Sequence, residues 1–483
     1  MAISPQKPHA ILVSYPLQGH VIPSVHLAIK LASRGFTITF INTQSIHNNI
    51  TSGDKNINGQ GDIFAEVRKS GLDIRYTTVP DGLPLGFDRS LNHDQFMAAL
   101  LHVFSAHVEE EVQKIVKSGP PVSYLIADTF FVWPGMLAKK YGLVYISLWT
   151  EAALVFSLYY HLDLLRLNGH FGCIDMREDP IDYIPGVKPL EPLDMPSYLQ
   201  EMYPTSVCHK IIYKAFKDAQ DADFVLCNTV EELEPETISA LQEKLPIFPV
   251  GPMFPSGFTK SCVATSLWSE SDCSHWLDTK PPGSVLYVSF GSYAHVQKRD
   301  LLEIANGIQE SNISFVWVLR PDIVSSEDRN PLPDGFRAAT SDRAMVIPWC
   351  CQINVLRHPA IGGFLTHCGW NSILESIWCE VPLLCFPLYT DQFTNRKLVV
   401  DDWKIGANLY DRVSVTQVEV SQKINRLMSK KSGDEFRNAI KVVKKTLEKA
   451  LKEDGSSEKN MDRFIRDLKI TLEKKNQTQK VVN

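Results

Sequence analysis

The sequence predicts an α/β protein with two doubly wound domains that face each other across a cleft. Its 483 residues are enough for two domains of ordinary size. Segments typical of buried strands alternate with segments typical of helices from His9 onward, stop in a Ser- and Thr-rich stretch, and restart at Val285. Two doubly wound halves joined by a linker are expected to place their ligand-binding edges on either side of a cleft.

This alternation divides the chain into four expected parts. They are a first domain over residues 1–249, a linker over 250–274, a second domain over 275–457, and a terminal helix with a tail over 458–483. We find no short-period repeat.

The first domain begins with a β-α-β unit. Residues 9–15 form an apolar strand, residues 21–33 a helix that ends before Gly35, and residues 36–42 the next strand. Further expected elements are strands at 74–79, 122–128, 144–148 and 224–228, and helices at 95–116, 134–141, 152–167 and 207–219. Residues 48–62 and 169–203 are expected to be irregular.

The second domain repeats this pattern. Strands are expected at 285–291 and 315–319, with a helix at 301–310 between them. An apolar run with a Gly pair, residues 361–366, predicts a buried strand, and a sharp turn then leads into a helix from Ser372. The chain from Gln417 is helical and Lys-rich, which is typical of a solvated helix face.

The composition is that of an ordinary globular protein. It is 44% apolar and 22% charged, and the net charge of −6 argues against a nucleic-acid-binding surface. The ten cysteines form no CxxC pair, and the short polar N-terminus leaves no room for a secretory signal, so we expect a cytoplasmic protein with reduced thiols. The most apolar region, 143–167, contains Glu151, His161 and Asp163 and is not expected to insert into a membrane. We expect a monomer.

One window, residues 349–392, combines residue types suited to a nucleotide sugar. Its strand–turn–helix element points backbone N–H groups and a positive helix end at a sheet edge, where phosphates bind. His367, Asn371 and Ser372 can donate hydrogen bonds to a diphosphate, and Glu375 can accept both hydroxyls of a ribose.

Other residues of this window extend the pattern. Trp349 offers a flat face for a base, and Asp391 with Gln392 offers acceptors and donors for a polyol. An alternative is that Ser372-x-x-Glu375 is only a capping box, which would leave the other residues unexplained.

The window resembles the donor-binding motif of the plant secondary-product glycosyltransferases, which use UDP-sugars and belong to glycosyltransferase family 1. The resemblance extends from about Pro8 to the final helix. It implies a GT-B fold of two Rossmann-like domains, an acceptor-binding first domain, a UDP-sugar-binding second domain, and a last helix that packs back onto the first. It also assigns Cys350, Gln352 and Trp370 to the UDP-sugar site.

The chain departs from that motif in two places. Cys350-Cys351 replaces Ala-Pro, and Glu380 replaces a Gly. In the family the residue after the Trp meets uracil through its backbone, so Cys350 is expected to be tolerated. Glu380 is expected to cost little in an exposed turn.

His20 follows the first strand in the turn PLQGH. Glycosyl transfer to an alcohol needs a base that takes the hydroxyl proton as the oxygen attacks the anomeric carbon, and imidazole suits that task near neutral pH. A His at a helix N-terminus is also a common structural residue. The resemblance identifies His20 with the family's general base.

Asp128 ends the strand at 124–128, and parallel strands end at one sheet edge, so it is expected near His20. A carboxylate on the second imidazole nitrogen would fix the tautomer and stabilise the imidazolium. Alternatively, Asp128 caps the helix that begins near Pro134. The family pattern Asp-x-Phe-x-x-Trp favours catalysis.

The resemblance implies three further contacts. Ser292 falls on the loop that contacts the diphosphate and Thr150 where the family touches the sugar, although either can be a plain cap. Gln392 at the last motif position goes with glucose in the family, and His there goes with galactose. The acceptor is expected to be small, largely apolar, and to have a hydroxyl or carboxyl. The aromatic residues expected to line its pocket, or else to be core, are Phe130, Phe131, Phe156, Tyr159 and Tyr160.

Neither a metal nor another cofactor is expected. Asp221-Ala-Asp223 matches the Mn²⁺ tripeptide of other glycosyltransferases, but it lies between a predicted helix and strand in the half without the donor motif. We interpret it as a helix-end charge pair. A helix dipole and neutral donors can stabilise the leaving group instead.

These features predict an inverting, metal-independent UDP-glucosyltransferase of plant secondary metabolism, whose partners are UDP-glucose and a small metabolite or hormone-type acceptor. One alternative is a UDP-sugar sensor without turnover, which would not need both His20 and Asp128. Another is a nicotinamide-dependent oxidoreductase, but no G-x-G-x-x-G follows the first strand.

Overall fold

The computed structural model describes residues 7–53, 62–173, 176–253, 266–324, 331–411 and 414–482, which form two compact units. The first contains the chain up to Leu190, Glu201–Leu267 and the chain from Lys449; the second contains Glu191–Gln200 and Trp268–Glu448. Parts of the predicted irregular stretch 48–62 and of the predicted linker 250–274 fall on residues 54–61 and 254–265, outside the described residues.

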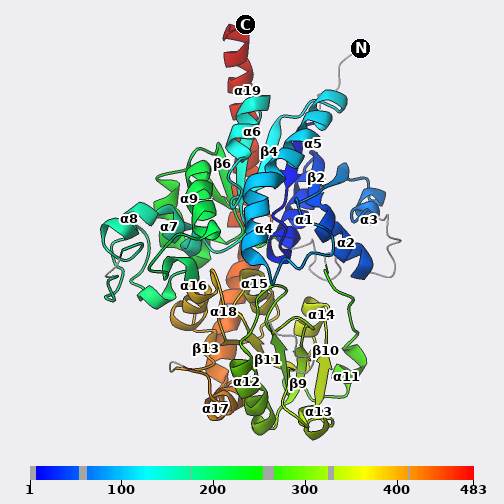
Figure 1. Ribbon diagram of the computed structural model, residues 1–483, viewed down its shortest axis with the longest axis vertical. Coiled ribbons are helices and arrows are strands. Elements are labelled where there is room, and N and C mark those ends of the chain that lie inside the picture. Colours follow the sequence, from blue (N-terminus) through cyan, green and yellow to red (C-terminus); the bar gives the residue numbers. More distant parts are fainter. Residues whose placement is uncertain are drawn as a thin grey trace. The chain divides into compact units, whose positions relative to one another are not determined.

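The first unit is built on a parallel sheet, with seven strands among the described residues in the order β3-β2-β1-β4-β5-β6-β7 (Figure 1). The strands are β1 (His9–Val13), β2 (Thr37–Thr43), β3 (Ile74–Val79), β4 (Tyr124–Asp128), β5 (Val144–Trp149), β6 (Phe224–Cys227) and β7 (Ile247–Pro249). Strand order reverses beside β1, and its carboxyl end is therefore the place where such a sheet holds its functional groups.

Helices connect these strands. They are α1 (Gln18–Ser33), α2 (Gln44–Gly53), α3 (Ala65–Lys69), α4 (His93–Ala99), α5 (Ser105–Ser118), α6 (Pro134–Tyr141), α7 (Ala153–Tyr160), α8 (Leu162–Leu167), α9 (Val207–Gln220), α10 (Pro235–Gln242) and the last helix α19 (Ser456–Val482). A π-helical turn, Leu100–Phe104, joins α4 to α5, and Glu231–Leu233 is a 3₁₀ turn.

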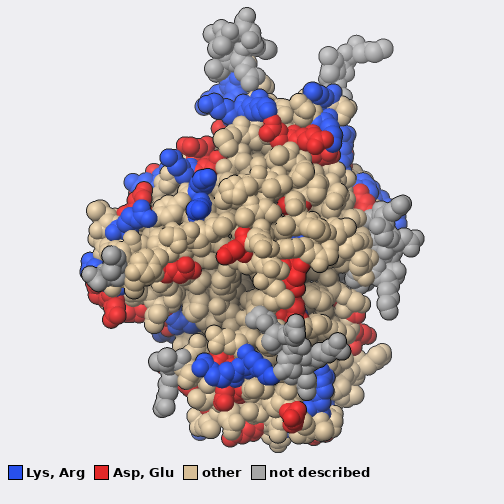
Figure 2. Space-filling model, in the orientation of Figure 1, with Lys and Arg blue, Asp and Glu red and all other residues tan. Residues whose placement is uncertain are grey.

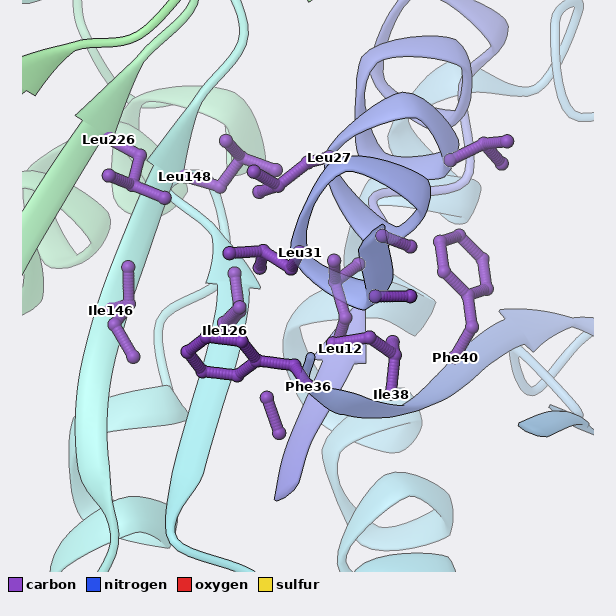
Figure 3. Close-up of a cluster of buried hydrophobic side chains, with 14 of the residues drawn as sticks. Leu12, Leu27, Leu31, Phe36, Ile38, Phe40, Ile126, Ile146, Leu148 and Leu226 are labelled. Carbon is purple, nitrogen blue, oxygen red and sulfur yellow. The ribbon is translucent and has the colours of Figure 1, made fainter. Parts of the chain in front are cut away.

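The core of this unit explains why its strands are apolar almost without interruption. Helices cover both faces of a parallel sheet, so side chains of both orientations are buried. Figure 3 shows Leu27 of α1 beside Leu148 of β5 and Leu31 of α1 beside Ile126 of β4, all in one buried cluster.

Helix α19 belongs to the first unit although it ends the chain (Figure 1). Its Phe464 ring lies 5.6 Å from Phe224 and 5.8 Å from Phe248, measured between ring centroids. Arg34, the residue after α1, forms ion pairs with Glu458 and Asp462. The helix is therefore an integral part of the first unit's core.

The second unit contains a parallel sheet with six strands among the described residues, in the order β10-β9-β8-β11-β12-β13. These are β8 (Val285–Ser289), β9 (Ser314–Val318), β10 (Ala344–Ile347), β11 (Ile361–Thr366), β12 (Leu383–Cys385) and β13 (Gly406–Asn408). The order repeats that of the first six strands of the other sheet, so β8 and β11 are the central strands between which polar loops meet.

The helices of this unit are α11 (Ser274–Asp278), α12 (Lys298–Ser311), α13 (Phe336–Ala339), α14 (Gln352–Leu356), α15 (Trp370–Trp378), α16 (Gln392–Lys397), α17 (Gln417–Met428) and α18 (Asp434–Ala450). Leu398–Asp402 is a π-helical turn after α16, and 3₁₀ turns lie at Pro192–Asp194 and Ser197–Leu199.

The helix predicted at 95–116 is helical from His93 to Ser118, with the π-helical turn inside it. Two other sequence predictions are wrong in detail. The helix predicted at 152–167 is two helices that meet at His161. The His161 Nδ1 atom lies 2.8 Å from the Ser157 carbonyl oxygen and closes the first of them. Part of the stretch predicted to be irregular is helix α2, because Ile46 and Ile50, one turn apart, are buried in the core.

The predicted domain boundaries also need correction. Residues Glu191–Gln200, expected within the first domain, group with the second unit, and the return to the first unit falls at Lys449 rather than at residue 458. The physical reason is a set of hydrogen bonds between Glu191–Gln200 and the start of α16, considered below.

Among the described residues, no helix combines the length and apolar character that crossing a membrane requires. On the face shown in Figure 2, Lys and Arg side chains are interspersed with Asp and Glu rather than gathered into one basic surface.

Candidate active site

His20 and Asp128 form a hydrogen-bonded pair in the first unit. His20 lies in the first turn of α1, the helix after β1, and Asp128 is the last residue of β4. Strands β1 and β4 are neighbours in the sheet. The His20 Nδ1 atom lies 2.7 Å from Asp128 Oδ2, and both side chains are buried. The Phe130 backbone N–H donates to Asp128 Oδ1 at 3.0 Å and fixes the carboxylate. The two predicted residues therefore pair through Nδ1 of His20 rather than through Nε2.

Thr150 lies against the same imidazole. Its Oγ1 is 2.9 Å from His20 Nδ1, and it follows β5 directly. Thr150 is predicted to contact the sugar; in the structure its hydroxyl contacts His20 of the His20–Asp128 pair. It therefore helps to hold the ring and is not simply a helix cap.

The five predicted acceptor-pocket aromatics lie in different surroundings. Phe130 contacts His20 edge-on, with ring centroids 5.7 Å apart, and Tyr15, which was not predicted, lies 5.3 Å from the same imidazole. Phe131 and Phe156 are core residues, packed on Trp133 and Trp149 respectively. Tyr159 is also buried, and Tyr160 is partly exposed and stacks on Phe156. Of the five, Phe130 thus contacts both His20, through its ring, and Asp128, through its backbone N–H.

The loops after β8 and β11 lie side by side in the second unit, because Ser289 and Thr366 pair at the strand ends. Ser292 is on the first loop and His367 on the second. Gly291 and Gly369 allow the close approach: a Cβ on either would lie 2.5 Å from His367 Nε2. Desolvation and the charge of Arg320 lower the pKa of His367 to about 4, so the imidazole is neutral at physiological pH.

Arg320, just after β9, was not predicted. Its guanidinium is almost fully buried and donates to the carbonyl oxygens of Gly291 at 2.8 Å and Ala294 at 2.6 Å, while pairing with Asp322. It therefore holds the loop that contains Ser292. The contacts are to backbone oxygens on another strand's loop, so no sequence motif indicates them.

Gln352, Ser372 and Glu375 form one hydrogen-bond network. The Gln352 Nε2 group donates to Ser372 Oγ at 3.0 Å and to Glu375 Oε2 at 2.7 Å, and Gln352 Oε1 accepts from Tyr287 at 3.4 Å. Desolvation raises the pKa of Glu375 to about 7, although the bond from Gln352 opposes the shift. Ser372 and Glu375 are thus joined through Gln352, and they do not form a capping box, because the N-cap of α15 is Gly369.

Trp349 and Cys350 lead into this network from β10. The Trp349 ring is largely buried and lies 6.5 Å from the Trp268 ring between centroids. The Cys350 side chain points into the core, with Sγ 3.6 Å from the Tyr287 hydroxyl. A Cys at this position is therefore compatible with a ligand that meets the backbone.

Helix α15 begins at Trp370, directly after the turn at Cys368, whose φ is +66°. The first turn of a helix presents backbone N–H groups that have no intrahelical acceptor. Asn371 lies there, partly exposed, whereas the Trp370 ring is buried 6.1 Å from Trp403 between centroids. Any direct contact of Trp370 with a ligand is thus through its backbone.

Asp391 and Gln392 end the loop between β12 and α16. The Gln392 Oε1 atom accepts from the backbone of Leu388 at 2.9 Å and of Tyr389 at 3.0 Å, which directs the side-chain amide N–H group elsewhere. Asn395, which was not predicted, donates to Asp391 Oδ2 at 2.5 Å and to the Cys368 carbonyl at 3.0 Å. It joins this loop to the start of α15.

The Asp221-Ala-Asp223 tripeptide has structural contacts. Asp221 ends α9, and the Asp223 carboxylate accepts from the Tyr145 backbone at 2.8 Å and from Lys475 at 2.7 Å. No group of three or more His, Cys, Asp or Glu suited to a metal ion occurs among the residues that the structure describes.

Two doubly wound parallel sheets, one ending in a His–Asp pair and the other in a helix N-terminus ringed by polar side chains, are the architecture of a GT-B glycosyltransferase. Residues 271–444 match the family model "UDP-glucoronosyl and UDP-glucosyl transferase". UDP-glycosyltransferase 86A2 of Arabidopsis thaliana is 61% identical over 95% of this chain and 94% of its own. UDP-glycosyltransferase 86A1 of the same plant is 56% identical over 97% of this chain and 96% of its own.

A solved structure agrees with these relatives. Phytolacca americana UGT2, complexed with UDP-2fluoro-glucose and pterostilbene, matches with a TM-score of 0.77 and 27% identity, over 96% of this chain and 100% of that chain. The chain belongs to the plant UDP-glycosyltransferases, and the family and fold expected from its sequence are confirmed.

Proposed function

We propose that this UDP-glycosyltransferase moves glucose from UDP-glucose to a hydroxyl or carboxyl of a small, largely apolar acceptor, with inversion at the anomeric carbon. The observation behind the proposal is the 2.7 Å bond between His20 Nδ1 and Asp128, which orients Nε2 as a base beside Phe130 and Tyr15. A buried base without a counter-charge would be poorly suited to accept a proton.

In the proposed reaction, His20 Nε2 takes the proton of the acceptor hydroxyl as its oxygen attacks the anomeric carbon. Asp128 stabilises the imidazolium that forms, and UDP leaves from the opposite face. One direct displacement converts an α-linked donor to a β-glycoside. A carboxylate acceptor is already ionised and needs less help from the base.

The leaving diphosphate is stabilised, in this proposal, by the N-terminus of α15 together with Ser292, His367 and Ser372. Because the pKa of His367 is lowered to about 4, its imidazole is neutral and can donate one N–H hydrogen bond without changing its protonation state near neutral pH. Trp349 and Cys350 receive the uracil, and Gln352 and Glu375 the ribose. These donors make metal-independent transfer chemically reasonable, and we propose that no metal or other cofactor takes part.

We propose that Asp391 and Gln392 bind the sugar hydroxyls and that Gln392 favours glucose. The amide group of Gln392 is oriented by two backbone donors to its oxygen, which supports a donor role toward a hydroxyl. Gln392→His is expected to lower the ratio of UDP-glucose to UDP-galactose turnover; an unchanged ratio would remove Gln392 from sugar selection.

The decisive experiment is His20→Ala, assayed with UDP-glucose and a panel of phenolic, terpenoid and hormone-like acceptors by mass shift. We expect at least a hundredfold loss of transfer to alcohols with UDP affinity within twofold of wild type. His107→Ala, on α5 of the same unit, is the matched control. Near-wild-type turnover of His20→Ala would contradict the base role, and wild-type binding of UDP-glucose without any transfer would indicate a sensor.

The proposal includes a cytoplasmic, monomeric enzyme. Nine described cysteines are free thiols, which agrees with a reducing compartment. Light scattering of the purified protein tests the monomeric state.

A further inference from the structure

The segment Glu191–Gln200, here called the strap, belongs to a different unit from the chain on either side of it. Leu190 and Glu201 on either side of it belong to the first unit, whereas the strap belongs to the second. The Ile181 and Leu190 backbones exchange hydrogen bonds of 2.8 and 3.2 Å, so the chain is anchored just before it leaves.

Ser197 of the strap forms hydrogen bonds with both backbone groups of Thr390. The Ser197 backbone N–H donates to the Thr390 carbonyl at 2.9 Å, and the Thr390 N–H donates to Ser197 Oγ at 2.9 Å. Thr390 is the residue before Asp391. These two hydrogen bonds together fix the position and the orientation of the Thr390 backbone.

Asp194 of the strap makes two further contacts, both with residues of α16. Thr394 Oγ1 donates to the Asp194 carbonyl at 2.6 Å, and the Asp194 carboxylate forms an ion pair with Arg396. Tyr198 and Tyr389 are hydrogen-bonded through their hydroxyls, with ring centroids 5.3 Å apart. The strap therefore contacts the residues on both sides of Asp391 and Gln392.

The held loop has a backbone that needs support. Thr390 has φ of +52°, a left-handed conformation that a β-branched residue adopts only when its surroundings impose it. The same residue donates through Oγ1 to Asp391 Oδ1 at 2.6 Å. Any relaxation of Thr390 would thus move the Asp391 carboxylate directly.

We propose that the strap, through Ser197 and Asp194, positions Asp391 and Gln392 for the donor sugar and so sets sugar specificity. The inference rests on the proposed function, in which these two residues bind the sugar. Ser197 and Asp194 act as positioning residues: their contacts are to the loop, and the loop contacts the ligand.

The strap is expected to affect the sugar and not the nucleotide. The bonds of Ser197 go to Thr390, and the Asp194 carbonyl and carboxylate contact Thr394 and Arg396, all beside Asp391 and Gln392. Uracil, ribose and diphosphate are instead assigned to Trp349, the Gln352–Glu375 network and α15. Hydrogen bonds to sugar hydroxyls depend on distance and angle, so a small displacement of Asp391 and Gln392 weakens them selectively.

The test compares the affinities of UDP, UDP-glucose and UDP-galactose by calorimetry without an acceptor. Ser197→Ala is expected to weaken UDP-glucose binding about fivefold and to lower its preference over UDP-galactose, with UDP within twofold of wild type. Ser197→Thr keeps a hydroxyl and is expected to retain the wild-type preference for UDP-glucose over UDP-galactose. Asp194→Asn, which loses the ion pair with Arg396, is a second variant with the same expected signature. Leu193→Ala is the control, because Leu193 is 75% exposed in the same turn.

Two results would overturn the inference: equal weakening of UDP and UDP-glucose, or no change in the sugar preference of either Ser197→Ala or Asp194→Asn. A double variant separates this inference from the proposed function. In a Gln392→Ala background, Ser197→Ala should weaken UDP-glucose binding less than in the wild type, because one of the two sugar-binding side chains that Ser197 positions is already absent. If Gln392→Ala alone leaves sugar affinity unchanged, the proposed donor site is wrong; if it weakens sugar binding while Ser197→Ala does not, only the strap inference fails.

Discussion

Gln352 donates a 2.7 Å hydrogen bond to the carboxylate of Glu375, whose pKa is raised to about 7 by desolvation. The first residue of α14 thereby holds a side chain of the second turn of α15, and the same amide also bonds Ser372. A carboxylate that titrates near neutral pH inside a proposed ribose site makes donor binding sensitive to pH.

The first prediction is a pH dependence of donor affinity. The ionised Glu375 accepts two ribose hydroxyl bonds and the protonated form accepts fewer, so affinity for UDP-glucose is expected to rise about tenfold between pH 6 and pH 8. Calorimetry with UDP-glucose measures it, since the terminal phosphate of UDP itself titrates in this range.

The control for this prediction is Glu375→Gln, which should bind UDP-glucose weakly and without the pH dependence. The same raised pKa has a consequence for the free protein. Because the folded state binds the Glu375 proton more tightly than the unfolded state, stability is expected to fall as pH rises toward about 7 and to do so less in the variant. A flat affinity profile for the wild type would contradict the ribose role.

The second prediction concerns Asp128. Asp128→Asn retains the shape of the pair with His20 but removes the charge that stabilises the imidazolium. We expect turnover to fall by about 10² to 10⁴-fold, with KM for UDP-glucose unchanged. Steady-state kinetics decides, and Asp221→Asn at the exposed end of α9 is the control. A loss confined to KM would place Asp128 in binding instead.

Proximity of residues can be predicted from the sequence where a motif is local or where topology alone brings the residues together. His20 and Asp128 are 108 residues apart, yet His20 follows one strand and Asp128 ends the neighbouring parallel strand, so their meeting at one edge could be predicted. The proposed donor-site residues from Trp349 to Gln392 could be named from the sequence because they lie within a single window of the chain; their binding roles remain predictions.

The supporting contacts could not be predicted in the same way. Arg320 bonds backbone carbonyls of the loop after β8, and Ser197 bonds the backbone of Thr390, 193 residues away. Backbone acceptors have no residue identity, so such contacts leave no pattern in a single sequence. For the same reason, the sequence does not indicate that Glu191–Gln200 interrupts the first unit and groups with the second.

The third prediction tests Arg320. Arg320→Ala would leave the carbonyls of Gly291 and Ala294 without their buried partner and Asp322 without its counter-charge. We expect a loss of about 3 kcal/mol in the unfolding free energy of the second unit, together with weaker UDP binding through the Ser292 loop. Urea denaturation measures the first effect. Arg299→Ala, an exposed Arg of the same unit paired with Asp300, should change stability by less than about 0.5 kcal/mol.

The last prediction concerns Glu380, where the family motif has Gly. Its φ is +59°, in the left-handed region that favours glycine, so the departure from the motif lies at a backbone position that a Gly would occupy without strain. Its carboxylate pairs with Lys444 at 2.8 Å, and both side chains are partly exposed. An exposed pair of this kind offsets only part of the conformational cost.

Glu380→Gly is therefore expected to raise the unfolding free energy by about 1 kcal/mol. The gain should be larger at high salt, where the ion pair with Lys444 contributes less. Asn312→Gly is the matched control, because Asn312 has a similar φ of +56° but Asn tolerates this conformation, and its gain should be smaller. Equal gains at the two positions, or a loss at Glu380 in high salt, would show that backbone strain at Glu380 is not the dominant effect.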